Sequence, residues 1–284
     1  MRAFEWYFEN LIEMKKCILA FLLMVSTCVV AQEKAIQDTV IEVNGVSFKM
    51  VAVAGGMFKM GAQNSDAEGS NYDSDAMVNE SPLHRVTLSD YYIGQTEVTQ
   101  ALYRVVMGSV PENKWNTSFG LGDKYPAYSV SWDEVMTFLQ RLDSLTGKKF
   151  RLPTEAEWEF AARGGKQSKG YKYSGSNNID SVAVFYDNYG KKNFSNALVM
   201  SKAPNELGIY DMSGSVYEWC NDWFGTYGSE AVTNPQGALT NSFRIVRGGA
   251  WRYKSKSCRV SARDYYNPEK KSQPFIGFRI VMER

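Results

Sequence analysis

The sequence predicts a single compact α+β domain. Three stretches in the first half of the chain carry apolar residues at helical spacing behind capping residues, and the second half consists of short segments divided by Gly, Asn, Ser and Pro. The chain has 284 residues, 44% of them hydrophobic, which is enough to bury one large core or two modest ones. Since no internal repeat or linker divides it, we expect helices and irregular strands to share one domain.

Each of the three predicted helices has a recognisable start. The second and third begin with a capping box, in which a Ser or Thr is followed three residues later by Glu. The first predicted helix follows Thr99. The second runs from Ser131 to Gly147, and the third from Thr154 to Gly164. Short strands are predicted at 57–60, 244–246 and 277–281, and the acidic run 62–81 is predicted to be a solvated loop.

The amino terminus, residues 1–31, is predicted to be a signal peptide. Two lysines at 15–16 precede an apolar run over 17–24, and small residues stand before a cleavage point that leaves Gln32 as the mature start. Met14 is an alternative initiator, because the stretch before it is too polar for the start of a signal peptide. The apolar run is too short to span a bilayer comfortably. We therefore expect export to the periplasm or the cell envelope.

Cys28 raises the alternative of an outer-membrane lipoprotein. Thr27 is a poor fit immediately before a lipidated cysteine, so plain export is the favoured interpretation. Membrane association is expected only if Cys28 carries a lipid. After the signal peptide, residues 32–45 are predicted to be a polar lead-in and residues 46–284 the folded domain.

Charge and cysteine content limit the partners and the redox chemistry. The formal net charge is +1, from 32 basic and 31 acidic residues, which offers no field to attract nucleic acid. Of the four cysteines, only Cys220 and Cys258 would remain after export. In an oxidising compartment these two could form a disulfide, or each could be a free thiol packed in the core. The sequence leaves both alternatives open.

An ordered set of phrases resembles one known family. It comprises GMFKMG at 56–61, ESPLHRV at 80–86, EVT at 97–99, VSWDE at 130–134, RLPTEAEWE at 151–159, PNELGIYDMSG at 204–214, EWC at 218–220, RGGAW at 247–251 and GFR at 277–279. This set is similar to the formylglycine-generating enzyme, or sulfatase-modifying factor, family. The resemblance runs from about Phe48 to the end of the chain. It implies an irregular α+β fold, related to C-type lectins, with little regular secondary structure.

The resemblance also implies a calcium site. The family loop binds Ca²⁺ through its first and last side chains and two carbonyls between them, which correspond here to Asp211, Gly214, Val216 and Glu218. Closely spaced hard oxygen donors suit a hard cation. The alternative is that Asp211 and Glu218 only cap a turn. A second family calcium site should fall near Asn188, where the motif is too loose to assign ligands.

The catalytic positions of the family are altered in this chain. Its oxidases convert a client cysteine to formylglycine with Cu(I) held between two cysteine thiolates, which are soft ligands that select this ion. In this sequence Tyr253 stands at the first cysteine position and Cys258 at the second. Ala250 replaces a serine and Tyr217 a tryptophan that border the family site. One thiolate and a phenol cannot supply the copper site, so copper is not expected.

Other candidate residues are assigned structural roles. A related branch of the family uses an iron centre held by several histidines, but this chain has one histidine, His84. We expect His84 to be a hydrogen-bonding residue of the fold. Three arginines beside glycines or aromatic residues, Arg259, Arg263 and Arg279, are expected to be buried structural cations, with Arg263 the best candidate to face a groove.

These observations support two hypotheses of function. The first is an exported, calcium-stabilised binding or assembly component of the bacterial cell envelope that has lost copper-dependent formylglycine-generating activity. The second is an oxidase or metalloenzyme of the formylglycine-generating type, which would act on a protein cysteine through an altered site with Cys258 and Tyr253. A protein or peptide is the partner expected in either case.

Overall fold

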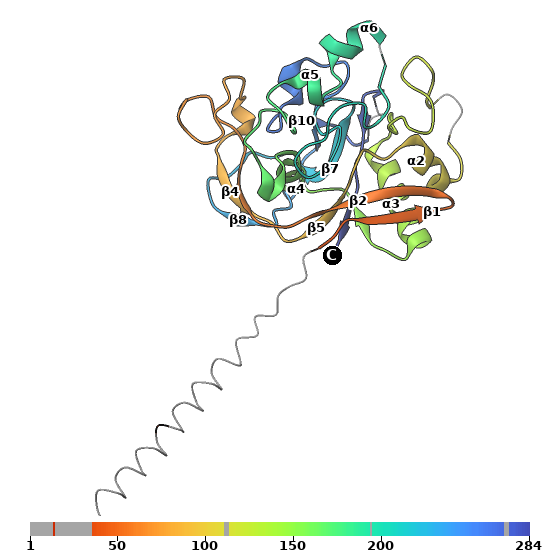
Figure 1. Ribbon diagram of the computed structural model, residues 1–284, viewed down its shortest axis with the longest axis horizontal. Helices are drawn as coiled ribbons and strands as arrows, with labels where there is room; N and C mark the ends of the chain where they lie inside the picture. The colour runs from red at the N-terminus through yellow and green to blue at the C-terminus, as the bar shows by residue number, and fades with distance from the viewer. Residues whose placement is uncertain (1–13, 15–35, 111–113, 194, 270–272) are drawn as a thin grey trace, which may run out of the picture. The chain divides into compact units, whose positions relative to one another are not determined.

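The computed structural model describes Met14 and residues 36–110, 114–193, 195–269 and 273–284 (Figure 1). Apart from Met14, the expected signal peptide and its cleavage point lie outside these residues. Residues Ile36–Arg284 form one compact unit. Over the described ranges, no helix combines the length and the apolar character needed to cross a bilayer.

Three small sheets and several short helices make up this unit. The strands are β1 Thr39–Val43, β2 Val46–Val53, β3 Met57–Met60, β4 His84–Thr87, β5 Tyr91–Gly94, β6 Phe150–Arg151, β7 Tyr217–Trp223, β8 Val232–Thr233, β9 Arg244–Arg247, β10 Arg263–Tyr266, β11 Ile276–Gly277 and β12 Val281–Glu283. The helical segments are η1 Val78–Glu80, α2 Gln100–Met107, α3 Trp132–Thr146, α4 Glu155–Ala162, η2 Gly165–Gln167, α5 Ile179–Val182, η3 Tyr186–Gly190, α6 Lys191–Asn193 and η4 Ser255–Cys258. The predicted α+β class is confirmed.

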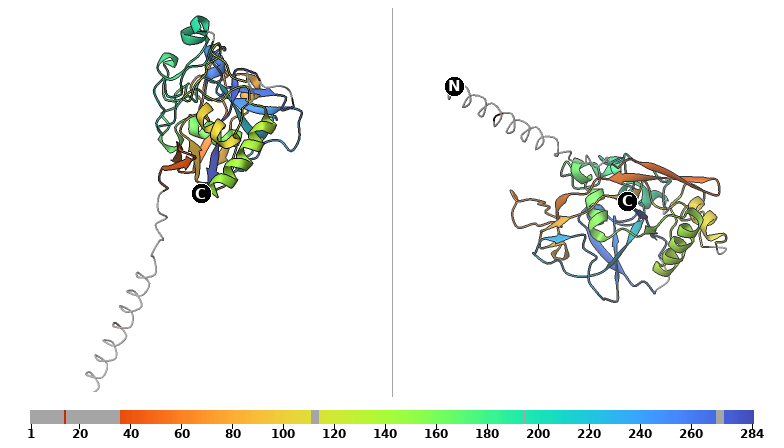
Figure 2. Two further views of the ribbon diagram at one scale, coloured as in Figure 1. Left: turned by 90° about the vertical axis from the view of Figure 1, so that its right-hand side faces the viewer. Right: turned by 90° about the horizontal axis from the view of Figure 1, so that it is seen from below.

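The sheets bring distant parts of the chain together. The strand orders are β1-β2-β5-β12-β6, β10-β9-β7-β11 and β3-β4-β8. The last strand, β12, therefore lies inside the five-stranded sheet, antiparallel to both β5 and β6. Helices α2 and α3 pack on each other, and α2 also contacts the β1–β2 hairpin (Figure 2).

The three predicted helices are present with their predicted starts. Thr99 caps α2 by accepting the Leu102 N–H at 3.3 Å. Helices α3 and α4 both begin with the predicted capping box. Gly147 ends α3 in the left-handed conformation, with φ of 69°, where a side chain would be strained.

The expected lead-in over 32–45 is wrong in its second half. Strand β1 begins at Thr39 and pairs with β2 from Thr39↔Met50 to Val43↔Val46. The turn residues Asn44 and Gly45 have φ of 49° and 80°. Positive φ at both positions is the requirement of a two-residue hairpin turn, and Asn-Gly is its preferred sequence. The folded domain therefore starts several residues before Val46.

The acidic loop over 62–81 is only partly solvated. Glu80 is fully buried and its carboxylate is bound by the guanidinium of Arg259, with one contact of 2.8 Å. The same guanidinium contacts Asp73 at 3.1 Å, and Asp73 also pairs with Lys172 at 3.0 Å. The loop is thus fastened at its end by ion pairs to residues far along the chain.

Buried arginines of the carboxy-terminal segment pair with glutamates from earlier elements. The pairs are Arg247–Glu159, Arg259–Glu80, Arg263–Glu155 and Arg279–Glu218. The structural role expected for Arg259, Arg263 and Arg279 is confirmed. Each pair joins residues at least 61 positions apart, so these contacts hold together parts of the chain that are distant in sequence.

We expect Arg259→Met to lower the free energy of unfolding by about 3–5 kcal/mol, because it leaves the Glu80 carboxylate buried beside no arginine. The double variant Arg259→Met/Glu80→Leu should recover most of this loss, since it removes both charges. Urea unfolding followed by tryptophan fluorescence measures both values.

The matched control is Lys149→Met, which removes an exposed ion pair with Asp143. Exposed pairs contribute less than about 1 kcal/mol. Equal losses in the Lys149 and Arg259 variants would contradict the assignment of the buried pair.

Candidate functional site

The loop between β9 and η4 carries the positions that the family uses for copper. Gly249 lies in the left-handed region, with φ of 75°, and a Cβ atom placed there would lie 2.8 Å from the Sγ of Cys258. The backbone of this loop therefore packs directly against the thiol. Because no side chain would fit between them, a glycine is required at position 249.

Cys258 is a buried, protonated thiol. Its side chain has no exposed surface and packs with Tyr173, Val182 and Phe185. The Sγ donates to the carbonyl oxygen of Lys254 at 3.8 Å. Burial raises the pKa of the Cys258 thiol to about 12. At neutral pH the group is thus neither the nucleophile nor the soft anionic ligand that copper chemistry needs.

The expected alternative of a Cys220–Cys258 disulfide is wrong. Both residues are free and buried, and they belong to different apolar clusters. Cys220 lies in β7, where burial, and then the charge of Asp222, raises the pKa of its thiol well above the usual range. The other alternative, a packed core thiol, describes both cysteines.

Tyr253 joins a group of rings that we call the tyrosine cluster: Tyr217, Tyr253, Tyr266 and Phe275. The hydroxyls of Tyr253 and Tyr266 are hydrogen-bonded at 2.8 Å. The ring of Tyr253 meets those of Tyr217 and Phe275 edge-on, with centroids 5.1 and 5.3 Å away. Burial raises the pKa of Tyr217 and of Tyr266 above its usual value. These phenols are therefore neutral at physiological pH.

The residues at this place do not fit the family's copper. Across the described part of the chain, no hydrogen bond joins Tyr253 to Cys258, and the Tyr253 hydroxyl already pairs with Tyr266. A two-thiolate site needs two ionisable sulfurs side by side, and one buried neutral thiol is present. The residues at this place pack as a cluster of neutral aromatic rings near a buried thiol.

The residues predicted to bind calcium lie where the chain enters β7. Asp211 and Gly214 have φ of 62° and 83°, so the backbone between them folds back tightly. One carboxylate oxygen of Asp211 accepts the Met200 N–H at 2.7 Å. The following residues, Val216 and Glu218, are both buried.

The carboxylate of Glu218 is held from two sides. Arg279 donates to its two oxygens at 2.7 and 3.0 Å, and the indole N–H of Trp158 donates to one of them at 2.7 Å. Among the described residues, no three His, Cys, Asp or Glu side chains form a group that could hold a metal ion. A calcium ion here would therefore depend on backbone carbonyl oxygens as well as on carboxylates.

Glu97 is the site residue that sequence reasoning missed. It is 1% exposed, and its carboxylate oxygens make no well-formed hydrogen bond among the described residues, although Ser215 and Asp211 lie close enough to interact with them. Burial raises the pKa of Glu97 well above its usual range, with the charges of Asp211 and Glu218 adding to the shift. The pKa of Asp211 rises to about 6, again chiefly through burial.

The charges around Glu97 do not balance. Three carboxylates, those of Glu97, Asp211 and Glu218, surround one guanidinium, that of Arg279. Buried carboxylates in excess must take up protons or bind a cation. An orphaned buried carboxylate beside the predicted loop fits a divalent ion that prefers hard oxygen ligands. In the sequence only the family motif EVT at 97–99 marks Glu97, and this motif does not indicate that the Glu97 side chain is buried.

We expect Cys220 and Cys258 to resist a thiol reagent at pH 7 in the native protein, because burial both shields them and keeps them protonated. In urea, both should react within minutes. Peptide mapping by mass spectrometry after alkylation identifies which cysteines are labelled. Native labelling of Cys258 as fast as in urea would contradict the buried neutral thiol, and a disulfide-linked peptide pair would restore the rejected bridge.

Comparison with known proteins agrees with the geometry. The chaperone protein LppX of Paenibacillus barcinonensis is 33% identical over 72% of this chain and 79% of its own. The formylglycine-generating enzyme of Streptomyces coelicolor is 29% identical over 81% of this chain and 87% of its own. The solved structure of Treponema denticola variable protein 1 covers 87% of this chain and 99% of its own, with 29% identity and a TM-score of 0.73. Residues 39–284 match the model of the sulfatase-modifying factor enzyme 1-like domain, and the chain belongs to this family.

Proposed function

We propose that this chain is an exported binding or assembly component of the bacterial cell envelope, without copper-dependent formylglycine-generating activity. One observation carries the proposal. Where the family places its first copper cysteine, Tyr253 is hydrogen-bonded to Tyr266. The remaining thiol, Cys258, is buried, with no second cysteine in its apolar cluster among the described residues, so the thiolate pair of the copper site is missing.

The tyrosine cluster is the proposed recognition surface for a protein or peptide. Tyr253 and Tyr266 are half-buried, so each ring presents an edge to solvent while its body packs inside. Tyr266 belongs to β10, which is an outer strand of its sheet. Large, rigid aromatic rings beside an outer strand suit contact with an extended peptide. The relative from Paenibacillus carries the name of a chaperone protein, which accords with client binding.

Calcium is proposed as a stabilising ion of the same domain. Asp211, Glu218 and the carbonyl oxygens of Gly214 and Val216 would hold it, and Glu97 supplies the excess negative charge beside them. The ion would neutralise the buried carboxylates and hold the chain at the entry to β7. The proposal that the protein is exported rests on the apolar run over 17–24 near the amino terminus.

We expect the protein to leave a Cys-x-Pro-x-Arg peptide unchanged when it is incubated with Cu(I) and O₂, because it has no thiolate pair. Mass spectrometry detects the loss that accompanies conversion of the thiol to an aldehyde. The variant Ala250→Ser/Tyr253→Cys restores two family residues and is the positive arm, in which measurable conversion is expected.

Conversion by the unaltered protein that disappears in Cys258→Ala would overturn the proposal. It would establish the alternative, an oxidase with an altered site. Conversion that persists in Cys258→Ala would point to contaminating copper chemistry, which a reaction without protein measures directly.

We expect a chelator to lower the melting temperature by about 5–10 °C at pH 8, which corresponds to the loss of an ion present at about 100 times its dissociation constant. The effect should vanish at pH 5. Below a pKa of about 6 Asp211 is protonated, and protons then replace the cation. Glu97→Gln should weaken the calcium effect, and Asp123→Asn, an exposed acid elsewhere, should not. A melting temperature that is unchanged by the chelator at pH 8 would contradict the proposed calcium site.

A further inference from the structure

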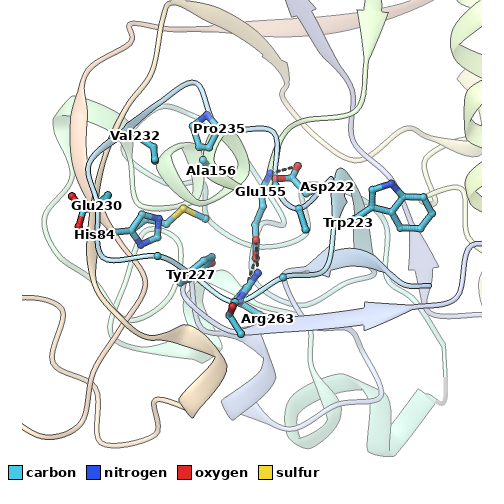
Figure 3. Close-up of a pocket in the computed structure, with 16 residues that line it drawn as sticks. His84, Glu155, Ala156, Asp222, Trp223, Tyr227, Glu230, Val232, Pro235 and Arg263 are labelled. Atoms are coloured by element: carbon cyan, nitrogen blue, oxygen red, sulfur yellow. Dashed lines mark hydrogen bonds and ion pairs between the residues drawn. The ribbon is translucent and has the colours of Figure 1, made fainter. Parts of the chain in front are cut away.

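A cavity of about 240 Å³ lies apart from the tyrosine cluster and from the calcium loop. Its walls come from the ends of β3 and β7, the starts of β4, α4 and β10, and the loop after β7 (Figure 3). The apolar part of its lining includes Met60, Ala156, Val232 and Pro235. None of the residues that the family uses for copper or calcium lines it.

The guanidinium of Arg263 already has a carboxylate and a carbonyl as hydrogen-bond partners. It donates to both oxygens of Glu155 at 2.6 and 2.8 Å and to the carbonyl oxygen of Asn79 at 2.7 Å. The Glu155–Arg263 pair is visible at the centre of Figure 3, next to the cavity. No other lysine or arginine lines the cavity within the described residues. The charge that the lining leaves uncompensated is therefore negative.

Asp222 is a latent source of that charge, because its carboxyl is protonated at pH 7 in the empty cavity and becomes negative only when it loses the proton. It is 3% exposed, and one of its oxygens accepts the Glu155 N–H at 2.9 Å. Gly237 presses its backbone against the side chain, because a Cβ atom there would lie 2.6 Å from the Asp222 Cβ. Burial, and then the nearby charge of Glu155, raises the pKa of Asp222 to about 8. The carboxyl group of Asp222 therefore lines the cavity in its protonated form, and a cation that enters the cavity would favour loss of this proton.

Two further polar groups, His84 and Glu230, line the same space. The ring of Tyr227 lines it as well, 3.9 Å from the Arg263 guanidinium, whereas its hydroxyl is enclosed and has no hydrogen-bond partner among the described residues. His84 lies 4.7 Å from that ring, and its Nδ1 pairs with the Pro82 carbonyl oxygen at 3.1 Å. In the neutral ring Nδ1 then carries the hydrogen and Nε2 is an acceptor. Glu230 adds an exposed carboxylate at the rim.

We propose that this cavity binds a primary ammonium group carried on a short apolar chain. An ammonium has three donors and no acceptor, and the lining offers acceptors at Asp222, His84 and Glu230 beside apolar walls. An apolar cavity of roughly 150 Å³ accommodates a ring of six carbons, so 240 Å³ holds an alkylamine of butylamine size. A free amine and the end of a lysine side chain share this chemistry.

Binding transfers a proton to solvent. The ligand enters as R–NH₃⁺, the Asp222 carboxyl loses its proton to the buffer, and an ammonium–carboxylate pair remains. No bond to carbon forms or breaks. Release of close to one proton per ligand at pH 7 is therefore a signature that a neutral ligand would lack. This site is independent of the function proposed above.

Isothermal titration calorimetry of the full chain with butylamine tests the proposal. We expect a dissociation constant on the order of 1 mM and proton release, measured as the dependence of the heat on the ionisation enthalpy of the buffer. Butanol and butyrate, the neutral and anionic analogues, should bind at least about ten times more weakly, since they lack the charge-assisted contacts. Tighter binding of Nα-acetyl-lysine amide than of butylamine assigns the ligand to a protein side chain, and the reverse order assigns it to a free amine.

Two variants locate the site. Asp222→Asn keeps an oxygen for the Glu155 N–H and should weaken butylamine binding at least tenfold, with proton release lost. Glu230→Gln removes the charge of the exposed carboxylate at the rim, should fold normally, and should weaken binding about threefold. Asp123→Asn, on the surface elsewhere, should change nothing. Absence of butylamine binding, equal binding of butanol or butyrate, or unchanged affinity in both cavity variants would overturn the proposal.

Discussion

The pairing of buried arginines with glutamates is the constraint on which this fold depends. Arg247, Arg259 and Arg279 are essentially without solvent exposure, and a buried guanidinium is tolerated where carboxylates and carbonyls take most of its donors. Arg247, for example, binds Glu159 and the carbonyl oxygens of Val260, Ser261 and Ala262, which leaves only its Nε without a hydrogen-bond partner among the described residues. A segment with little regular structure thereby acquires fixed positions, because each cation can be satisfied in only one place.

The same network explains how catalytic residues can change while the fold persists. The copper positions belong to the loop that Arg247 introduces, but Tyr253 and Cys258 make none of the ion pairs. Gly249 is fixed by its approach to the Cys258 sulfur, whatever the sulfur does chemically. Replacement of one thiol by a phenol therefore costs little in packing, since Tyr253 finds Tyr266 as a partner and Tyr217 and Phe275 as neighbours.

Sequence reasoning succeeded where the signal is local and failed where the partner is distant. The helix starts at Ser131 and Thr154 were predictable because a capping box lies within four residues, and the start at Thr99 because its capping side chain is equally local. The hairpin at Asn44 carried an equally local signal that was overlooked. By contrast, the burial of Glu80 depends on Arg259, which lies 179 residues away. The disulfide alternative failed for the same reason, since the separation of two cysteine side chains in space cannot be read from their spacing in sequence.

Two places in this domain hold more carboxyl groups than the arginine beside them pairs with, and their surroundings differ. Around Arg279 the excess acids, Glu97 and Asp211, are buried next to each other and to Glu218, an oxygen-rich setting that suits a proton or a bare metal ion. Around Arg263 the excess acid, Asp222, borders a cavity with apolar walls. A hydrated metal ion would gain nothing from those walls, whereas an organic ammonium would bury its chain against them and its charge against the acid. The surroundings of the excess acids therefore favour different cations at the two places.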